Sequence, residues 1–294
     1  MKPLREMALA GEALSGEKVI DCHGHLGRWG PFYVPRCTAA DIIATMDRLG
    51  ITAIVASAHR AIGPDFVVGN EHAAQAAQEH RGHFFFYAAV NPNYRREGIT
   101  AELERRAREP GFVGVKLHPD VHRQPANADG YVAAWEFAHD RALPVLSHTW
   151  HGSQFDPPGM FRDLAKTYNR ATIILGHSGG SPAGNKESAQ VARECENVFL
   201  DICGSQHHYR SLESLVEQVG AERVLFGTDL PFIDPRPQLG RVLMSRLSDE
   251  QKRAILGLNA LRIFSINIHP VSENSPNAQR SRGRPRRMGG RGAQ

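Results

Sequence analysis

The residues of this chain best suited to chemistry are histidines and one aspartate at the ends of short apolar runs. They are His23, His25, His148, His177 and Asp229. Imidazole nitrogens and a carboxylate that meet at one point are the ligands that a divalent metal such as zinc requires. The spacing of these residues along the chain therefore raises the question of which fold would bring them together.

The residues from 21 to 25, DCHGH, end the first apolar run. Side chains alternate along a strand, so we expect His23 and His25 to point to the same side. Cys22 would then point away from the metal into the layer between strands and helices, where it would pack as core. An isolated His-x-His pair is a weak signal, and its weight comes from the further polar residues that end later strands.

The elements that must position these side chains alternate between strand and helix. The strand-like runs end near residues 25, 57, 89, 118, 148, 177, 203 and 229, with charged, helix-like stretches between them. Eight βα units with a nearly constant pitch of about 30 residues predict a (β/α)8 TIM barrel. A doubly wound sheet is the alternative, but residues 24–27, GHLG, do not form its GxGxxG phosphate loop.

We expect three segments along the 294 residues. Residues 1–17 form an N-terminal extension, residues 18–268 form the barrel with two closing helices in 248–264, and residues 269–294 form a basic tail. The tail is rich in Gly, Ser, Pro and Arg, a composition that cannot bury a core and predicts disorder.

Charge is concentrated in that tail. The chain has a net charge of +4, and residues 271–294 contribute +5 from six arginines and Glu273, so the remaining 270 residues sum to −1. A nearly neutral body favours neither a nucleic-acid partner nor a membrane surface. Arg282 to Pro285, RGRP, resemble the AT-hook core, but we interpret them as part of an ordinary Arg-rich extension.

The expected cellular compartment is inferred from three sequence features: apolar runs, the N-terminal residues and the cysteines. No apolar run approaches the roughly 18–20 residues of a membrane span, and the first 18 residues show no apolar core of a signal peptide. The four cysteines are scattered without a CxxC pair, which favours reduced thiols. We therefore expect a cytoplasmic protein.

Six short motifs carry a resemblance to a known family. They are DCHGH (21–25), GVKLHP (114–119), PVLSHT (144–149), GHSGG (176–180), GTDLPF (227–232) and GLNA (257–260). They run in family order over roughly residues 18–265. The chain resembles the amidohydrolase superfamily, and more closely its amidohydrolase-related branch, which includes aminocarboxymuconate-semialdehyde decarboxylase.

The resemblance implies roles for the residues at the strand ends. His23, His25, His148 and Asp229 would bind the metal, and Asp229 would also accept a proton from the metal-bound water. His177 would act beside the metal, or would bind a second metal as in binuclear relatives. The family often forms dimers, so a homodimer is an expectation, although no interface can be read from the residues.

Four further residues are candidates for binding substrate: Lys116, His118, Trp150 and Arg60. Lys116 falls on the fourth strand, where some relatives carry a carboxylated lysine that bridges two metals. We favour Lys116 as a partner for a substrate anion, and hence one metal, most plausibly zinc. Trp150 has the alternative of loop packing, and Arg60 that of a surface ion pair. Asp201 lies within the seventh strand and needs a partner if it is buried.

The chemistry that such a centre supports divides into two classes. A metal held by histidines and a carboxylate lowers the pKa of its bound water to about 7, which permits hydrolysis of an amide, ester or lactone of a small molecule. The alternative is non-oxidative decarboxylation of a small unsaturated or aromatic carboxylic acid, in which the metal stabilises the charge that develops. The sequence does not separate the two, and we favour the hydrolase.

Overall fold

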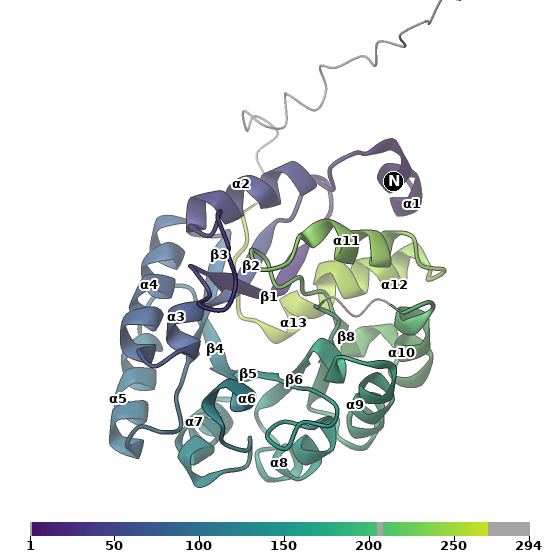
Figure 1. Cartoon of the computed structure of the whole chain (residues 1–294). Coiled ribbons are helices and arrows are strands. Elements are labelled where there is room, and N and C mark those ends of the chain that lie inside the picture. Colours follow the sequence, from purple (N-terminus) through teal and green to yellow (C-terminus); the bar gives the residue numbers. More distant parts are fainter. Residues whose placement is uncertain (1, 205–207, 270–294) are drawn as a thin grey trace, which may run out of the picture.

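The computed structural model describes residues 2–204 and 208–269, and its centre is one parallel sheet that curls into a barrel (Figure 1). The strands are β1 (Ile20–Leu26), β2 (Ala53–Ala58), β3 (Phe84–Ala89), β4 (Phe112–Leu117), β5 (Pro144–His148), β6 (Thr172–Gly176), β7 (Val198–Asp201) and β8 (Val224–Leu225). Each pairs in parallel with the next along the chain. Backbone hydrogen bonds from Cys22 N to Phe226 O (2.9 Å) and from Asp229 N to His23 O (2.8 Å) close the ring. The predicted (β/α)8 barrel is confirmed.

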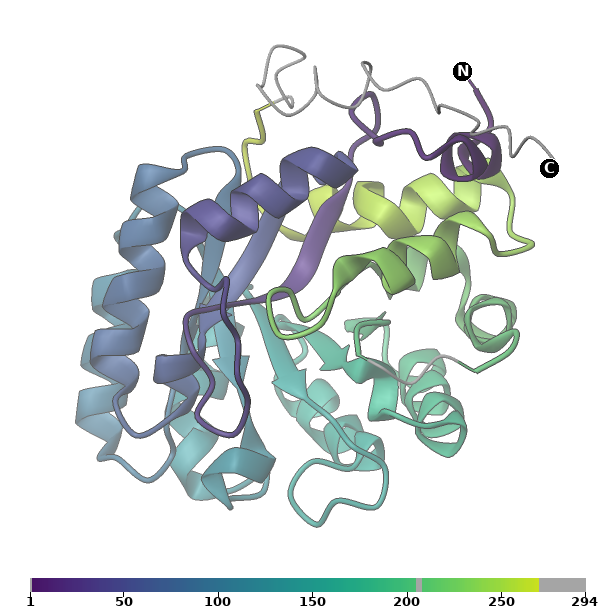
Figure 2. The ribbon, with the colours of Figure 1, turned by 45° about the horizontal axis from the view of Figure 1, so that its top comes forward.

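Helices surround the strands and cover the outside of the barrel (Figure 2). They are α1 (Leu4–Ala10), α2 (Ala39–Leu49), α3 (His59–Ile62), α4 (Phe66–Glu79), α5 (Arg96–Arg106), α6 (Pro119–His122), α7 (Val132–Arg141), α8 (Phe161–Thr167), α9 (Pro182–Glu194), α10 (Ser211–Val219), α11 (Pro235–Leu243), α12 (Asp249–Arg253) and α13 (Asn259–Ile263). Short 3₁₀ turns at 129–131, 158–160, 177–179 and 221–223 and a π turn at 254–258 complete the connections.

Capping residues explain where the helices begin and end. In α2 the Thr38 side chain accepts a hydrogen bond from Asp41 N, and the Asp41 carboxylate accepts one from Thr38 N, which forms a capping box. Gly50 ends the helix with φ of 77°, a left-handed conformation that glycine adopts without steric cost. These signals set the bounds of α2 at Ala39 and Leu49, in one of the helix-like stretches that the sequence predicts between strands.

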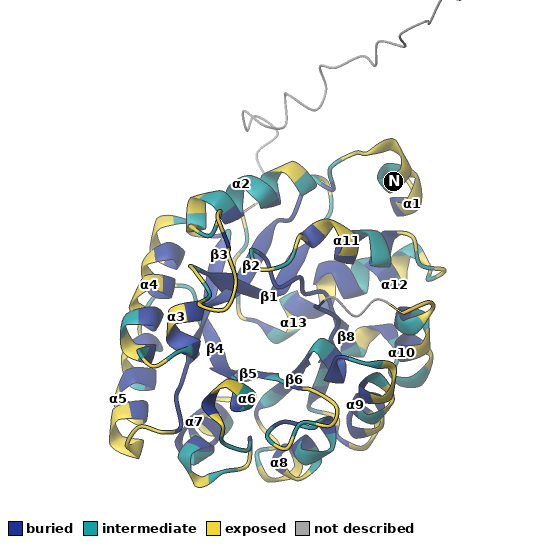
Figure 3. Cartoon of the chain, in the orientation of Figure 1, coloured by how far each residue is buried: buried dark blue, intermediate teal, exposed yellow. Residues whose placement is uncertain are grey.

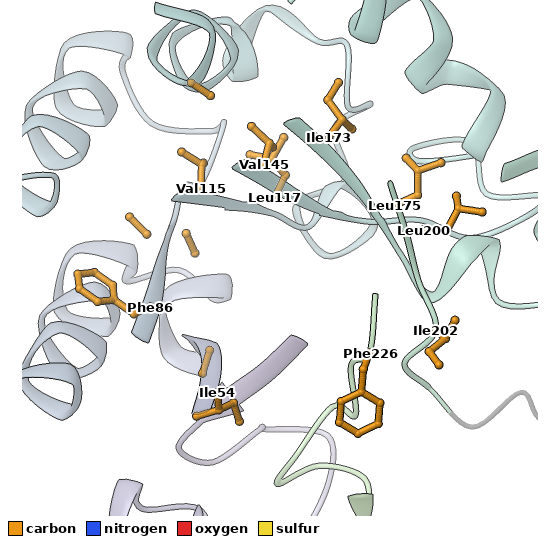
Figure 4. Close-up of a cluster of buried hydrophobic side chains, with 14 of the residues drawn as sticks. Ile54, Phe86, Val115, Leu117, Val145, Ile173, Leu175, Leu200, Ile202 and Phe226 are labelled. Atoms are coloured by element: carbon orange, nitrogen blue, oxygen red, sulfur yellow. The ribbon is translucent and has the colours of Figure 1, made fainter. Parts of the chain in front are cut away.

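Two buried clusters stabilise the barrel, and the buried residues line the strands and the inward faces of the helices (Figure 3). The outer cluster packs strands against helices, and includes Phe86, Val115 and Leu200, whose side chains point away from the ring of strands (Figure 4). The inner cluster includes Tyr87 and Leu146. Full burial of each large apolar side chain contributes about 1.5–3 kcal/mol, so both layers are needed to hold the strand ends in place.

The first strand departs from strict alternation. The register between β1 and β2 shifts between Asp21 and Gly24. Cys22 consequently belongs to the inner cluster, and its carbonyl accepts a hydrogen bond from the Tyr87 hydroxyl at 2.9 Å. The prediction that Cys22 packs in the strand–helix layer is therefore wrong, because a bulge resets which side chains face inward.

The N-terminal helix α1 packs on the outside of the barrel. Helix α1, within the expected extension 1–17, packs against α11, and Leu4 is fully buried with its N–H donating to Asp249. The predicted tail lies outside the described residues except for His269, and the AT-hook-like residues 282–285 lie there with it. None of the helices in the described part of the chain has the length and apolar character to cross a bilayer.

A buried histidine on α6 gives a testable property of the fold. His122 accepts from the Tyr131 hydroxyl through Nδ1 (2.7 Å) and donates to the Ile62 carbonyl through Nε2 (2.8 Å), so it is held neutral. Burial lowers the pKa of His122 from 6.5 to about 4. Between these values the unfolded chain binds a proton that the native protein does not, so stability falls as the pH drops through this window, by up to about 3 kcal/mol from this residue.

Urea unfolding of the parent and of His122→Gln at pH 7 and pH 4.5 measures this contribution. We expect the stability advantage of the parent to shrink by about 2–3 kcal/mol at the lower pH. An advantage that is the same at both pH values would show that His122 does not titrate as its burial requires.

Candidate metal centre

Four metal-ligating side chains meet at the carboxyl ends of the strands. They come from β1 and from the segments that follow β6, β7 and β8: His23, His177, Cys203 and Asp229. Each offers one ligand atom, and these atoms all lie within 4.8 Å of one another. Barrel enzymes build their sites at this end, because every strand delivers its next residue to the same rim.

His23 lies at the centre of the cluster, with both ring nitrogens engaged. Its Nδ1 donates to Asp201 Oδ2 at 2.6 Å, and its Nε2 accepts from Lys116 Nζ at 2.7 Å. A carboxylate on the far nitrogen of an imidazole fixes the tautomer and the ring orientation in metal sites. Gly227 makes this approach possible, because a Cβ at that position would meet Asp201 Oδ1 at 2.2 Å and His23 Cβ at 2.8 Å.

Asp229 is the anionic group of the cluster. Its Oδ1 lies 3.3 Å from His25 Nε2 and 3.5 Å from His23 Nε2, and its Oδ2 lies 3.7 Å from His177 Nδ1. Burial alone would raise the pKa of Asp229, but its contacts with His177, His23 and the hydrogen-bonded His25 hold it well below the usual value. Its backbone has φ of 64°, a left-handed conformation that non-glycine residues adopt at a cost of about 1–3 kcal/mol and that clusters at functional sites.

Three imidazoles of the site, those of His25, His118 and His177, are kept neutral by burial. Burial lowers the pKa of His177 to about 3, and it lowers the pKa values of His25 and His118 well below 6.5. A neutral imidazole has a lone pair free for a metal, and a carboxylate supplies the negative charge that a divalent cation needs. The donor set therefore fits such a cation.

A cavity of about 210 Å³ opens directly above this cluster. Its walls come from residues at the strand ends and the loops after them: His25, Trp29, His59, Ile62, His118, His148, Trp150, His177, Gly180, Cys203, Gly204, Asp229, Phe232 and Ile233. Trp150 packs over Gly180, where a Cβ would meet the indole ring at 2.3 Å. Three aromatic rings around a polar floor suit a small, flat organic molecule.

The comparison with known protein families gives one match. The family model described as amidohydrolase matches residues 20–266, which is most of the chain and the whole barrel. The chain belongs to this family. A search of curated proteins found no match.

Solved structures with a similar fold have names of two kinds, decarboxylase and hydrolase. The 5-carboxyvanillate decarboxylase LigW from Sphingomonas paucimobilis is 16% identical, with a TM-score of 0.69 over 85% of this chain and 99% of its own. A dihydroxybenzoic acid decarboxylase from Polaromonas sp. JS666, with bound manganese and 2-nitroresorcinol, is 20% identical, with a TM-score of 0.69 over 87% and 99%. A probable 2-pyrone-4,6-dicarboxylic acid hydrolase from Acinetobacter baumannii is 15% identical, with a TM-score of 0.59 over 84% and 98%.

The structure places the predicted ligands of this amidohydrolase in two groups. His23, Asp229 and His25 lie together through the contacts given above. His148 lies at the edge, its ring 4.9 Å from that of His177 and stacked 4.2 Å from that of His118. The ligand roles of His25 and His148 stay predictions, and Cys203 joins the cluster instead.

The predicted substrate-binding residues also separate. His118 and Trp150 line the cavity. Lys116 is buried beneath it against His23, and burial lowers the pKa of Lys116 to about 8. Arg60 does not line the cavity; it is exposed on α3 and pairs with Asp65 at 3.1 Å, so the surface ion pair is the arrangement observed.

Several residues of this site are not predicted from the sequence. Asp156 holds His148 Nδ1 at 2.7 Å, as Asp201 holds His23. His59 stacks on His25 at 4.4 Å, and Trp29 and Phe232 complete the cavity wall. Strand-end position could have indicated His59, which follows β2 directly. Asp156 lies eight residues beyond β5 in an irregular loop, where spacing gives no signal.

Proposed function

We propose that this amidohydrolase is a metal-dependent decarboxylase that removes carbon dioxide from a small hydroxylated aromatic carboxylic acid. The observation that carries the proposal is the charge of the cavity. Its described lining contains the ionised Asp229 and several imidazoles but no lysine or arginine. Lys116, beneath the cavity, is fully buried against His23 and does not reach the lining, so an anionic substrate needs a further cation bound at the floor of the cavity.

The cluster under the cavity can hold that cation. Asp229 would bind it together with the donors beside it and with His23, whose Nε2 would bind the cation in place of its hydrogen bond from Lys116. The charge of the cation would bind the carboxylate and hydroxyl oxygens of the substrate. We take zinc as the cation expected from the imidazole-rich donor set. The similar dihydroxybenzoic acid decarboxylase was solved with manganese, so metal identity needs a direct measurement.

The shape of the cavity supports an aromatic substrate. Trp29, Trp150 and Phe232 present ring faces and edges against which a flat ring can pack. His118 lines the same space, and its buried Nδ1 has no hydrogen-bond partner among the described residues. Buried polar atoms are nearly always paired, so a substrate oxygen is the partner that we assign to it.

Asp229 provides the proton transfers that decarboxylation requires. As an ionised carboxylate it takes the proton of the ring hydroxyl, which makes the ring electron-rich. It then returns that proton to the ring carbon that carries the carboxylate. The bond to the carboxylate breaks with its electron pair left on the ring, carbon dioxide leaves, and the phenolate product takes a proton from solvent.

Hydrolysis, which the sequence favoured, comes second. Of the three similar structures described above, two are named as decarboxylases and have the higher TM-scores. The wall of aromatic rings accommodates a flat lactone as well as a benzoate, so shape does not separate them. The preference for decarboxylation rests on the need to neutralise a substrate carboxylate.

The deciding experiment measures gas release and ring opening on the same protein. With zinc or manganese added, we expect the purified chain to release carbon dioxide from 2,6-dihydroxybenzoate, 5-carboxyvanillate or a related hydroxybenzoate. We expect a chelator to abolish the release and added metal to restore it. Opening of lactones or esters without carbon dioxide from any hydroxybenzoate would contradict the proposal and support the hydrolase.

A further inference from the structure

Cys203 differs from the other buried cysteines in what its sulfur contacts. Its Sγ lies 3.1 Å from His177 Nδ1 and 2.9 Å from His23 Nδ1, the ring nitrogen that Asp201 also holds, and the residue lines the cavity as a member of the cluster of four donors. The sulfurs of Cys22 and Cys195 instead contact backbone carbonyls at 3.8 Å and 3.7 Å. A sulfur among imidazole nitrogens is an arrangement typical of metal binding rather than of packing.

The backbone after β7 puts the sulfur there. Cys203 N donates to Asp201 Oδ1 at 3.0 Å, and the same aspartate holds His23 through its other oxygen. Cys203 and His23 are thus fixed by one buried carboxylate. The side chain of Cys203 is 5% exposed, so its position is set by the barrel and not by a free loop.

The separations between donor atoms suit one small ion. Around a tetrahedral zinc, ligand atoms lie about 3.3–3.8 Å apart, given bond lengths of about 2.0–2.3 Å. His177 Nδ1 lies 3.7 Å from Asp229 Oδ2, within this range, and Cys203 Sγ lies 3.1 Å from His177 Nδ1, just below it. His23 Nε2 lies 3.5 Å from Asp229 Oδ1.

We propose that Cys203 binds the metal as a thiolate, together with His23, His177 and Asp229. This inference rests on the metal dependence proposed above and makes it more specific. On binding, the S–H bond breaks, a sulfur–metal bond forms and the proton passes to solvent.

A sulfur ligand has a consequence for metal choice. Thiolate favours zinc and similar borderline cations, whereas manganese prefers oxygen ligands. The manganese found in the similar dihydroxybenzoic acid decarboxylase is therefore not the cation expected here. We expect this chain to bind zinc or cobalt in preference to manganese.

X-ray absorption of the zinc-loaded full chain tests the proposal without any substitution. We expect a sulfur neighbour at about 2.3 Å in addition to nitrogen and oxygen at about 2.0–2.1 Å. A zinc shell of nitrogen and oxygen alone would overturn the proposal.

Titration of the metal-free protein with cobalt tests the residue. In the parent and in the matched control Cys195→Ser, we expect a sulfur-to-cobalt charge-transfer band that saturates at one equivalent. In Cys203→Ser we expect the band to disappear. Zinc affinity should fall by more than the roughly 10–100-fold that loss of an outer partner costs, with little change for manganese. A band that persists in Cys203→Ser would overturn the assignment.

These readouts are independent of turnover. A sulfur–zinc signal in a protein that decarboxylates no hydroxybenzoate would leave this site in place and remove the proposed substrate class. Decarboxylation by a protein whose zinc has no sulfur neighbour would do the reverse.

Discussion

Replacing Asp229 with asparagine is expected to lower the rate of decarboxylation by about 10³-fold, within the range that proton transfer by a positioned side chain contributes. The amide has nearly the same shape as the carboxylate but cannot take the hydroxyl proton and return it to carbon. It also removes the negative charge beside His23, His25 and His177. The measurement is the rate of carbon dioxide release at saturating substrate, with the bound metal counted in the same samples.

A second readout separates proton transfer from metal loss in this variant. Incubated with product in deuterium oxide, the parent should exchange the ring hydrogen at the former carboxylate position, because Asp229 runs the protonation step in reverse. Asp229→Asn should not exchange it even when metal is supplied in excess. Asp163→Asn, the same change at an exposed position on α8, is the matched control and should behave as the parent. Normal exchange in Asp229→Asn would exclude Asp229 as the proton carrier.

The location of this site can be predicted from the sequence because the carboxyl ends of parallel strands in a barrel all lie at the same rim. His23, His177 and Asp229 are far apart along the chain, yet each follows an apolar run at a steady pitch. Once that pitch indicates a closed barrel, the three must share one rim. The same pitch predicts strand ends near residues 89 and 148, which are where β3 and β5 end.

The remaining features depend on geometry that periodicity does not encode. The bulge in β1 changes which side Cys22 faces, and the last strand ends at Leu225, four residues before Asp229. Cys203 resembles a core cysteine in sequence and becomes a candidate ligand through the turn that Asp201 fixes. The substrate class cannot be predicted from the sequence either. The proposal for it depends on the lack of lysine and arginine in the described cavity lining, and only the structure shows which residues form that lining.

Substituting Asp201 is expected to weaken metal binding strongly, and it would do so through His23, the residue that Asp201 holds. Asp201 is fully buried and does not line the cavity above the cluster, but it accepts the hydrogen bond of His23 Nδ1 at 2.6 Å. Burial would raise the pKa of Asp201, yet the His23 imidazole holds it below the usual value, so the group is a carboxylate. An ionised partner makes the imidazole more basic and fixes Nε2 toward the cluster. We therefore expect Asp201→Asn to weaken zinc binding by about 10–100-fold.

Competition with a chromogenic chelator measures that loss, and Asp156→Asn supplies a matched comparison. Asp156 is buried and holds His148 Nδ1 at 2.7 Å, so the two variants remove the same charge from the same kind of pair. If the cation is bound by His23, His177, Cys203 and Asp229, zinc affinity falls in Asp201→Asn and is nearly unchanged in Asp156→Asn. Equal losses would restore His148 to the ligand set that the sequence predicts. Unchanged affinity in Asp201→Asn, with the fold intact by circular dichroism, would mean that His23 does not bind the metal through an oriented Nε2.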